Sequence, residues 1–299
     1  MTPLVRERAV WFGPKQGLAG ILSTPRTAHT GAPLIVIVNA GVVHRVGPNR
    51  LNVDIARKLA SRGYTVLRFD LRGLGDSEPL TGGSSLTDAA VADVRSAFDF
   101  LEATQGAQSF ICCGLCSGAN YSLLTSFADP RVVGLLLVDP TVARTRRGKI
   151  IHYAHRLLNL ATWGAMLTMR HSRLRRAIGR QRGMAVAQAA QGQSEQQEPT
   201  QVNGEQARAS IERVLDRGVQ LMLVFTGGVN HVYNYRNQLF DLLPGVNFRD
   251  QLNLIFMPET DHTVGDLPSR QKLLQSIGEW MTRCFPTSPA PNAAPKQPE

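Results

Sequence analysis

The sequence lacks the features that mark secreted, membrane-spanning and metal-binding proteins. It has only four cysteines in 299 residues, and three of them lie together at positions 112, 113 and 116, so no spaced set exists to cross-link a small secreted domain. The N-terminus has no apolar leader segment, and no apolar run reaches the roughly 18 residues that a membrane-spanning helix needs. No cysteine or histidine spacing is typical of a metal site. We therefore expect a cytoplasmic protein without metal or cofactor.

Acidic residues are absent from one long stretch. Residues 143–183 contain 11 Lys and Arg and no Asp or Glu, whereas the rest of the chain has 22 basic and 23 acidic residues, so the net charge of +10 belongs to this segment. The segment has one Trp, one Tyr and no nucleic-acid-binding motif, and we expect no nucleic acid partner. Its charge would suit an acidic carrier protein or an anionic membrane surface.

What the chain does have is a regular alternation of strand-like and helix-like segments. Hydrophobic residues make up 43% of it, enough for one large core. The first two strands predict an antiparallel hairpin, and the later ones are apolar runs typical of strands buried on both faces. The expected strands are 7–12, 18–24, 33–39, 64–70, 110–113, 132–139, 219–226 and 252–257, and the expected helices are 49–62, 86–103, 117–128, 233–243 and 269–284. This order predicts an α/β fold with a mostly parallel eight-stranded sheet and helices on both faces.

The alternation stops after the sixth expected strand. Residues 140–217 contain no convincing strand; their first part is basic and helix-like, and their second part is rich in Gln, Ala and Ser. We expect a core of residues 1–139 and 218–285, with a basic helical cap and linker at 140–217. Residues 286–299 are rich in Pro and Ala, which predicts a disordered tail.

A short stretch between the fifth strand and the following helix has the pattern of a nucleophile elbow. In such a turn, glycines two residues before and after the nucleophile let the backbone pack closely enough to project one side chain. Gly114 and Gly118 have this spacing around Cys116. If Ser117 were the nucleophile, the bulky Leu115 would occupy a position that the turn needs to keep small. The spacing therefore predicts a thiol nucleophile.

The same stretch allows a second interpretation. Cys113 and Cys116 form a C-x-x-C pair between a strand and a helix, which is where thioredoxin-like proteins carry a redox pair. This chain is much longer than that fold, and the elbow already explains the glycines. We therefore favour the elbow.

Two further residues follow the carboxyl ends of later strands, where the ligand lies in an open parallel sheet. Asp139 ends the sixth strand, and His262 lies just after the last one. With Cys116 as the nucleophile, His262 would act as base and then acid, and Asp139 would hold its tautomer. The chain order is nucleophile, acid, histidine, as in α/β-hydrolases.

Four motifs in this order resemble the α/β-hydrolase superfamily. They are residues 39–50 (NAGVVHRVGPNR), 67–77 (LRFDLRGLGDS), 114–118 (GLCSG) and 261–263 (DHT). Within the superfamily the chain is similar, over residues 6–284, to serine-aminopeptidase-like and exosortase-system-associated hydrolases. The usual elbow residue there is Ser, so Cys116 implies chemistry closer to the cysteine-dependent members, such as those resembling dienelactone hydrolase.

The resemblance also implies an oxyanion hole and an acid. One oxyanion donor would be the backbone N–H of Ser117, and the second that of Gly41 or Val42, in the loop after the third strand. The usual site of the acid follows the penultimate strand, where this chain has Asn230. Asp139 is the alternative position that some members use, and Asn230 could instead be a neutral orienter.

Four residues are candidates for substrate binding. His44 and Arg45 either bind a carboxylate or phosphate of the substrate or are simply solvated. The other two candidates are Asn230 and, in the basic cap, Trp163.

Two functions remain open. One is an enzyme that hydrolyses or transfers the acyl group of a small ester or thioester through Cys116. The other is a catalytically silent protein that binds an anionic partner through its cap.

Overall fold

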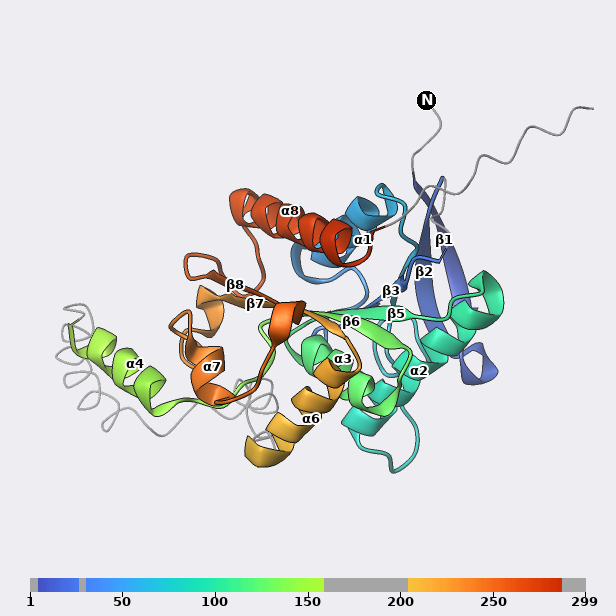
Figure 1. Ribbon diagram of the computed structural model, residues 1–299. Coiled ribbons are helices and arrows are strands. Elements are labelled where there is room, and N and C mark those ends of the chain that lie inside the picture. Colours follow the sequence, from blue (N-terminus) through green and yellow to red (C-terminus); the bar gives the residue numbers. More distant parts are fainter. Residues whose placement is uncertain (1–4, 27–30, 159–203, 287–299) are drawn as a thin grey trace, which may run out of the picture.

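A computed structural model of the chain describes residues 5–26, 31–158 and 204–286 (Figure 1). Trp163 and most of the predicted cap and tail lie outside these ranges. Within them, no helix combines the length and the apolar character that crossing a bilayer requires.

The sheet has eight strands in the order β1-β2-β4-β3-β5-β6-β7-β8. The β1–β2 and β2–β4 pairs are antiparallel and all the other pairs are parallel, which confirms the predicted mostly parallel sheet with an antiparallel edge (Figure 1). The strands are β1 (Val5–Phe12), β2 (Leu18–Pro25), β3 (Leu34–Val38), β4 (Val66–Phe69), β5 (Phe110–Leu115), β6 (Val132–Val138), β7 (Gln220–Thr226) and β8 (Leu252–Met257).

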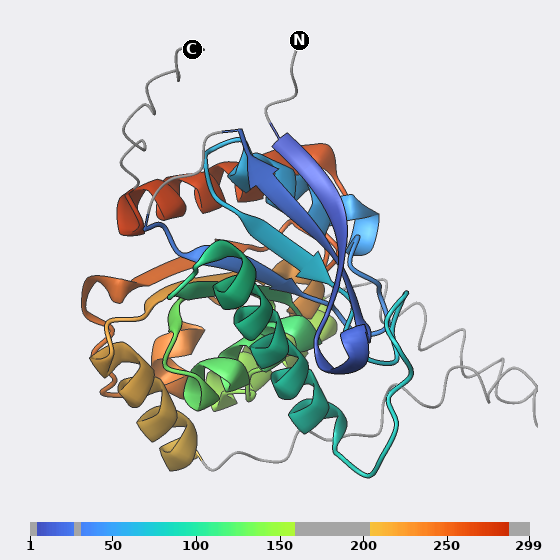
Figure 2. The ribbon, with the colours of Figure 1, turned by 90° about the vertical axis from the view of Figure 1, so that its right-hand side faces the viewer.

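Helices cover both faces of this sheet (Figure 2). On one face lie α1 (Leu51–Ala60) and α8 (Leu267–Cys284), and on the other lie α2 (Leu86–Gln105), α3 (Ser117–Ala128) and α6 (Gly204–Asp216). Short 3-10 helices occupy Pro14–Gln16, Pro48–Arg50, Gly227–Val229 and Arg249–Gln251.

The apolar strands explain why two helical layers form. Successive side chains of a strand point to opposite faces, so Ile35 and Ile37 of β3 pack under α1 and α8, while Val36 and Val38 pack under α2 and α3. All four are buried, and each contributes about 1.5–3 kcal/mol of stability relative to an exposed side chain. The carboxyl edge of this central sheet carries the candidate site.

The structure describes part of the segment expected to be cap and linker. Helix α4 (Arg146–Leu158) follows β6, and its first turn is fastened to the loop after β7, because Asn234 Nδ2 donates to the Gly148 carbonyl at 2.8 Å. The later helix α6 buries Val214 and Leu215 in the main core. The core therefore extends to residues before 218, where we expected it to resume.

The helix expected at 233–243 is shorter in the structure. Only α7 (Gln238–Leu242) is helical, because Gln238 accepts from the Asn234 N–H at 3.0 Å and donates to the Val232 carbonyl, which holds the preceding residues in a loop. Tyr233 of this loop is buried and stacks on Phe225 of β7, with ring centroids 3.6 Å apart. Tertiary packing here overrides the helical periodicity.

Candidate active site

Cys116 lies at the turn between β5 and α3, in a backbone conformation that non-glycine residues rarely adopt. Its φ is 56° and its ψ is −120°. A Cβ at Gly114 would collide with the backbone of Gly118, and a Cβ at Gly118 would lie 2.7 Å from the Val38 carbonyl oxygen at the end of β3. Neither position can hold a side chain, which explains the spacing seen in the sequence. The turn presents Cys116, which is half-buried, at the carboxyl edge of the sheet.

Asp139 and His262 meet at the same edge. His262 Nδ1 lies 2.7 Å from Asp139 Oδ2, and the Asp139 side chain is fully buried. Thr226, at the end of β7, donates to the same carboxylate twice, from its backbone N–H at 2.7 Å and from its hydroxyl at 2.6 Å. Asp139 has a positive φ of 47°, which aspartate tolerates better than most residues. The carboxylate is therefore held from two sides and faces the imidazole.

The third contact in the site joins Cys116 to His262, whose side chains are hydrogen-bonded. This hydrogen bond lowers the pKa of Cys116 and outweighs burial, which acts in the opposite direction. The pKa of His262 is raised to about 10, because hydrogen bonds to Asp139 and to Cys116 favour the protonated ring. Both shifts act in the same direction and favour a thiolate beside an imidazolium as the resting form of the pair.

The loop that carries His262 is held by its own side chains and by one contact from the segment before α1. Asp261 accepts hydrogen bonds from the backbone N–H of Thr263 at 2.7 Å and of Gly265 at 3.0 Å. Asn49, just before α1, donates to the Thr263 hydroxyl at 3.1 Å. Asp266 caps α8, because its carboxylate accepts a hydrogen bond from the Ser269 N–H at 2.8 Å. This carboxylate therefore stabilises the start of the helix.

The loop after β3 brings one of the two expected oxyanion donors to the elbow. The Gly41 backbone N–H donates to the Ser117 hydroxyl oxygen at 2.7 Å, and the Ser117 N–H points at the Cys116 sulfur. The Gly41 N–H thus ends on the first residue of α3, and the Ser117 N–H ends on the candidate nucleophile just before it. Val42 is at the exposed tip of this loop, with 89% of its surface accessible, and the next amide, Val43 N–H, closes a turn onto Ala40.

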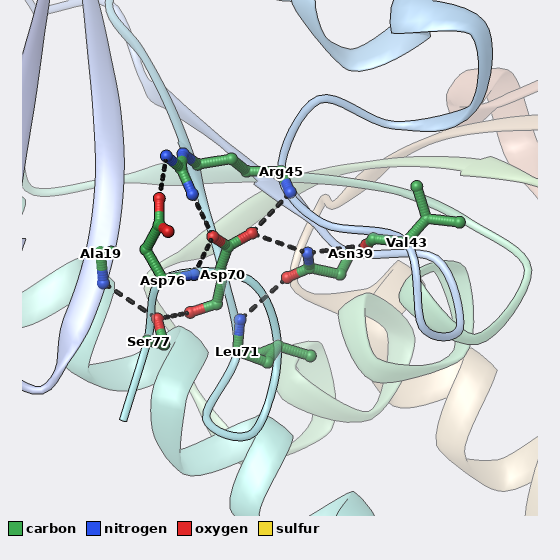
Figure 3. A network of polar contacts seen from close by, with 8 residues as sticks. All are labelled: Ala19, Asn39, Val43, Arg45, Asp70, Leu71, Asp76 and Ser77. Atoms are coloured by element: carbon green, nitrogen blue, oxygen red, sulfur yellow. Dashed lines mark hydrogen bonds and ion pairs between the residues drawn. The ribbon is translucent and has the colours of Figure 1, made fainter. Parts of the chain in front are cut away.

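The candidate substrate-binding residues do not contact Cys116, His262 or Asp139 through any hydrogen bond that the structure shows among the described residues. Arg45 directs its guanidinium to Asp70 and to Asp76, so it is engaged within the protein (Figure 3). His44 is exposed on the same loop. Asn230 is also exposed, and the hydrogen bond from His262 goes to Asp139.

The C-x-x-C alternative finds no support in the environment of Cys113. Cys113 is buried under α1 and α8, and burial raises the pKa of its thiol, as it does for the neighbouring Cys112. A buried thiol with a raised pKa is a poor redox partner, because the thiolate is the reactive form. All three cysteines of this stretch are free.

Sequence reasoning missed several residues around the site. Thr226 ends the strand next to β6, so its position beside Asp139 is visible only once the strand order is known. Tyr121 is half-buried, and burial together with the nearby Cys116 raises the pKa of its hydroxyl. Asp70 was hidden within a motif, and the structure shows it to be buried beneath the loop after β3.

Several basic side chains near the site influence one another electrostatically. His231 is largely exposed, and its pKa is lowered by partial removal from water and by the positive charges of Arg144, His152 and His262. The segments that carry them are fastened together, because the Thr145 and Tyr235 hydroxyls are 2.9 Å apart and the Arg147 guanidinium lies over the Tyr235 ring, 4.9 Å from its centroid. We call Arg144, His152 and His231 the basic rim.

The described residues contain no group of three His, Cys, Asp or Glu side chains that could hold a metal ion. A hollow of about 490 Å³ exists on the surface of α1 and α8, lined by Lys58, Arg62, Gln271, Leu274, Gln275 and Glu279. None of these residues belongs to the site at Cys116, and the chemistry of the site does not involve this hollow.

Residues 35–241 of the chain match the Hydrolase_4 family, described as serine aminopeptidase, S33. No curated protein matches the chain.

Several solved structures share the fold. A lidless α/β serine hydrolase from Xanthomonas campestris is 16% identical with a TM-score of 0.54, and the match covers 95% of this chain and 97% of that one. An esterase from Pyrococcus furiosus is 14% identical with a TM-score of 0.57, covering 94% and 91%. A cold-adapted esterase from an Arctic intertidal metagenomic library is 14% identical with a TM-score of 0.55, covering 95% and 96%.

Proposed function

Because the chain belongs to the Hydrolase_4 family of α/β-hydrolases (serine aminopeptidase, S33), we propose that it cleaves a small ester or thioester through a Cys116 acyl-enzyme and passes the acyl group to water or to another acceptor. The observation that carries this proposal is the hydrogen-bonded series from Cys116 through His262 to the buried Asp139. It combines a nucleophile, an acid-base group and an orienting carboxylate at the carboxyl edge of the sheet.

The first half of the reaction, acylation, starts from the Cys116 thiolate beside protonated His262. The Cys116 thiolate attacks the carbonyl carbon, and the carbonyl oxygen becomes an oxyanion near the N–H groups of Ser117 and Gly41. As the oxyanion collapses, the bond to the leaving group breaks, and His262 gives that group its proton from Nε2. The products are a Cys116 thioester and a free alcohol or thiol.

The second half reverses the proton transfer. Neutral His262 takes a proton from water, the resulting hydroxide attacks the thioester carbonyl, and the Cys116–acyl bond breaks. The acid is released and the thiolate and imidazolium are restored. Asp139 accepts from Nδ1 throughout, which keeps Nε2 directed at Cys116.

A panel of substrates tests this function. We would incubate the protein with p-nitrophenyl esters and acyl thioesters of graded chain length and compare it with Cys116→Ala. Turnover by the wild-type protein and its absence in the variant support the proposal. Equal, slow release of nitrophenol by both proteins would contradict it, because it would come from non-specific surface groups.

The basic rim favours a substrate, or a partner, that carries an anion. Arg144 and His231 are exposed, and no carboxylate among the described residues forms an ion pair with Arg144, so its charge is available to an anion. In the enzyme, the rim would attract an acyl donor with a carboxylate or phosphate group. In a catalytically silent protein, it would bind an acidic carrier or an anionic membrane surface. Turnover of neutral esters by Cys116 discriminates between the two, because only the enzyme shows it.

A further inference from the structure

The loop after β3, which supplies the Gly41 N–H, is fastened to the end of β4 by a buried carboxylate (Figure 3). Asp70 follows β4, and its side chain has no accessible surface. A carboxylate removed from water in this way needs several donors, because an unpaired buried charge costs several kcal/mol. The donors to Asp70 therefore show what the carboxylate holds in place.

Two of the donors belong to Arg45, on the loop itself. The Arg45 backbone N–H donates to Asp70 Oδ1 at 2.5 Å, and its guanidinium forms an ion pair with Asp70 Oδ2. The other arm of the same guanidinium contacts Asp76 Oδ2 at 2.5 Å. The pKa of Arg45 is raised, since its hydrogen bonds to Asp76 and Asp70 outweigh the opposing effect of burial. The Arg45 guanidinium thus joins the loop after β3 to Asp70, at the end of β4, and to Asp76, in the loop that follows.

The other donors come from both sides of the carboxylate. Asn39 Nδ2 lies 3.3 Å from Asp70 Oδ1 and also donates to the Val43 carbonyl at 3.0 Å. From the opposite side, the Asp76 N–H donates to Asp70 Oδ2 at 3.1 Å, an approach that Gly75 permits because a Cβ at that position would collide with the carboxylate. The loop is therefore held at Asn39, Val43 and Arg45, on both sides of Gly41.

We propose that Asp70 and Arg45 are positioning residues, which hold the Gly41 N–H where the oxyanion forms. The Gly41 N–H already points at the elbow, because its acceptor in the structure is the Ser117 hydroxyl oxygen at 2.7 Å. Gly41 itself has a positive φ of 52° and no atom within 4 Å of the place where a Cβ would lie, so local packing does not fix it. Its position depends on the contacts that flank it. This inference rests on the proposed function, since it assigns Gly41 the role of oxyanion donor.

The test compares Arg45→Gln with a matched control, Arg72→Gln. Arg72 carries a similar ion pair, with Nε 2.6 Å from Asp93 Oδ1, on the 71–77 loop, but it fastens that loop to α2. Each variant loses one guanidinium and keeps its backbone hydrogen bond, from Arg45 N–H to Asp70 or from Arg72 N–H to Asp93. Both changes therefore remove an arginine that pairs with a buried carboxylate, but at different places.

Two reactions of Cys116 are measured in each protein. Acylation by p-nitrophenyl acetate passes through an oxyanion, whereas alkylation by iodoacetamide does not. We expect Arg45→Gln to slow acylation by about 10-fold to 100-fold, with the loss in kcat and little change in KM, and to leave alkylation unchanged. Arg72→Gln should change neither reaction. Arg45→Lys, which keeps the charge but cannot join both carboxylates, should fall between the wild type and Arg45→Gln.

Two results would overturn the proposal. One is normal acylation in Arg45→Gln, and the other is an equal loss of acylation and alkylation, which would indicate general damage to the site. A third measurement does not depend on activity. Amide hydrogen exchange at residues 41–45 should be about 10-fold faster in Arg45→Gln and unchanged in Arg72→Gln. Unchanged exchange in Arg45→Gln overturns the proposal, while faster exchange in a protein that never acylates supports the loop contact and refutes the proposed function alone.

Discussion

Replacing Asp139 by Asn should change the proton on His262 without removing any atom from the core. Asp139 Oδ1 accepts from the backbone N–H of Thr226, which cannot rotate, so the amide of the variant must place its oxygen there. Its NH₂ group then occupies the position of Oδ2, 2.7 Å from His262 Nδ1. Since this group only donates, Nδ1 must accept, and the imidazole proton moves to Nε2, facing Cys116. The Thr226 hydroxyl can rotate to accept from the same group.

The size of the effect follows from the resting pair. In a serine triad, the same carboxylate-to-amide change costs about 10⁴ in kcat. Here the lowered pKa of Cys116 favours the thiolate, so part of the loss comes from the higher pKa of the thiol in the variant. Once that pKa exceeds the assay pH, each further unit lowers the thiolate fraction tenfold. We expect kcat/KM at pH 7 to fall by about 10² to 10⁴.

Two pH profiles measure this prediction. In the wild type, alkylation of Cys116 by iodoacetamide should stay at its plateau from high pH down to the lowered pKa of the thiol and fall below it. Turnover should also fall as the pH rises through about 10, where His262 loses the proton that it gives to the leaving group. In Asp139→Asn the acid limb of the alkylation profile should move to higher pH. Asp93→Asn, which alters another buried carboxylate away from the site, is the control. Profiles for Asp139→Asn that superimpose on those of the wild type would refute the orienting role.

Three further predictions concern the histidine, the elbow and the basic rim. His262→Asn removes the hydrogen bond that lowers the pKa of Cys116, so alkylation at pH 7 should slow by about 10-fold; an unchanged rate would mean that another group activates the thiol. Gly118→Ala places a Cβ 2.3 Å from the backbone carbonyl oxygen of Asn39 and should lower stability by about 3 kcal/mol in a thermal melt, whereas Gly83→Ala, which meets nothing within 4 Å, should not. Arg144→Glu should raise KM for an anionic ester strongly at low salt and weakly at high salt, because exposed charges are screened over about 8 Å at physiological ionic strength. Equal losses on a neutral ester would show that the variant had disturbed the fold instead.

The fold and the elbow could be predicted because their signals are local. Continuous apolar runs identify the buried strands and apolar residues at steps of four identify most of the helices. The spacing of Gly114 and Gly118 reports a steric limit that the backbone at the turn imposes. Asp139 and His262 could be proposed because strand ends of a parallel sheet share one edge. These predictions need only the pattern within each segment and the rule that parallel strands end at the same edge of the sheet.

The rest depends on contacts between segments that are far apart in sequence. Thr226 reaches Asp139 across 87 positions, and Arg45 reaches Asp70 across 25, so neither contact has a sequence pattern of its own. Arg45 was predicted as either a ligand-binding or a solvated residue, and only the structure shows its two carboxylate partners. The helix α6 was missed because its polar surface hides the few apolar residues that reach the core, Ile211, Val214 and Leu215.

The central claim is that the acyl group passes through Cys116, and intact-protein mass spectrometry with peptide mapping tests it most directly. The protein would be quenched in acid within seconds of mixing with a p-nitrophenyl ester and then digested. We predict one added acyl group, on the peptide that contains β5 and the start of α3, attached as a hydroxylamine-sensitive thioester at Cys116 and absent from Cys116→Ala. An acyl group bound as an oxygen ester to Ser117, present in Cys116→Ala and lost in Ser117→Ala, would contradict the account.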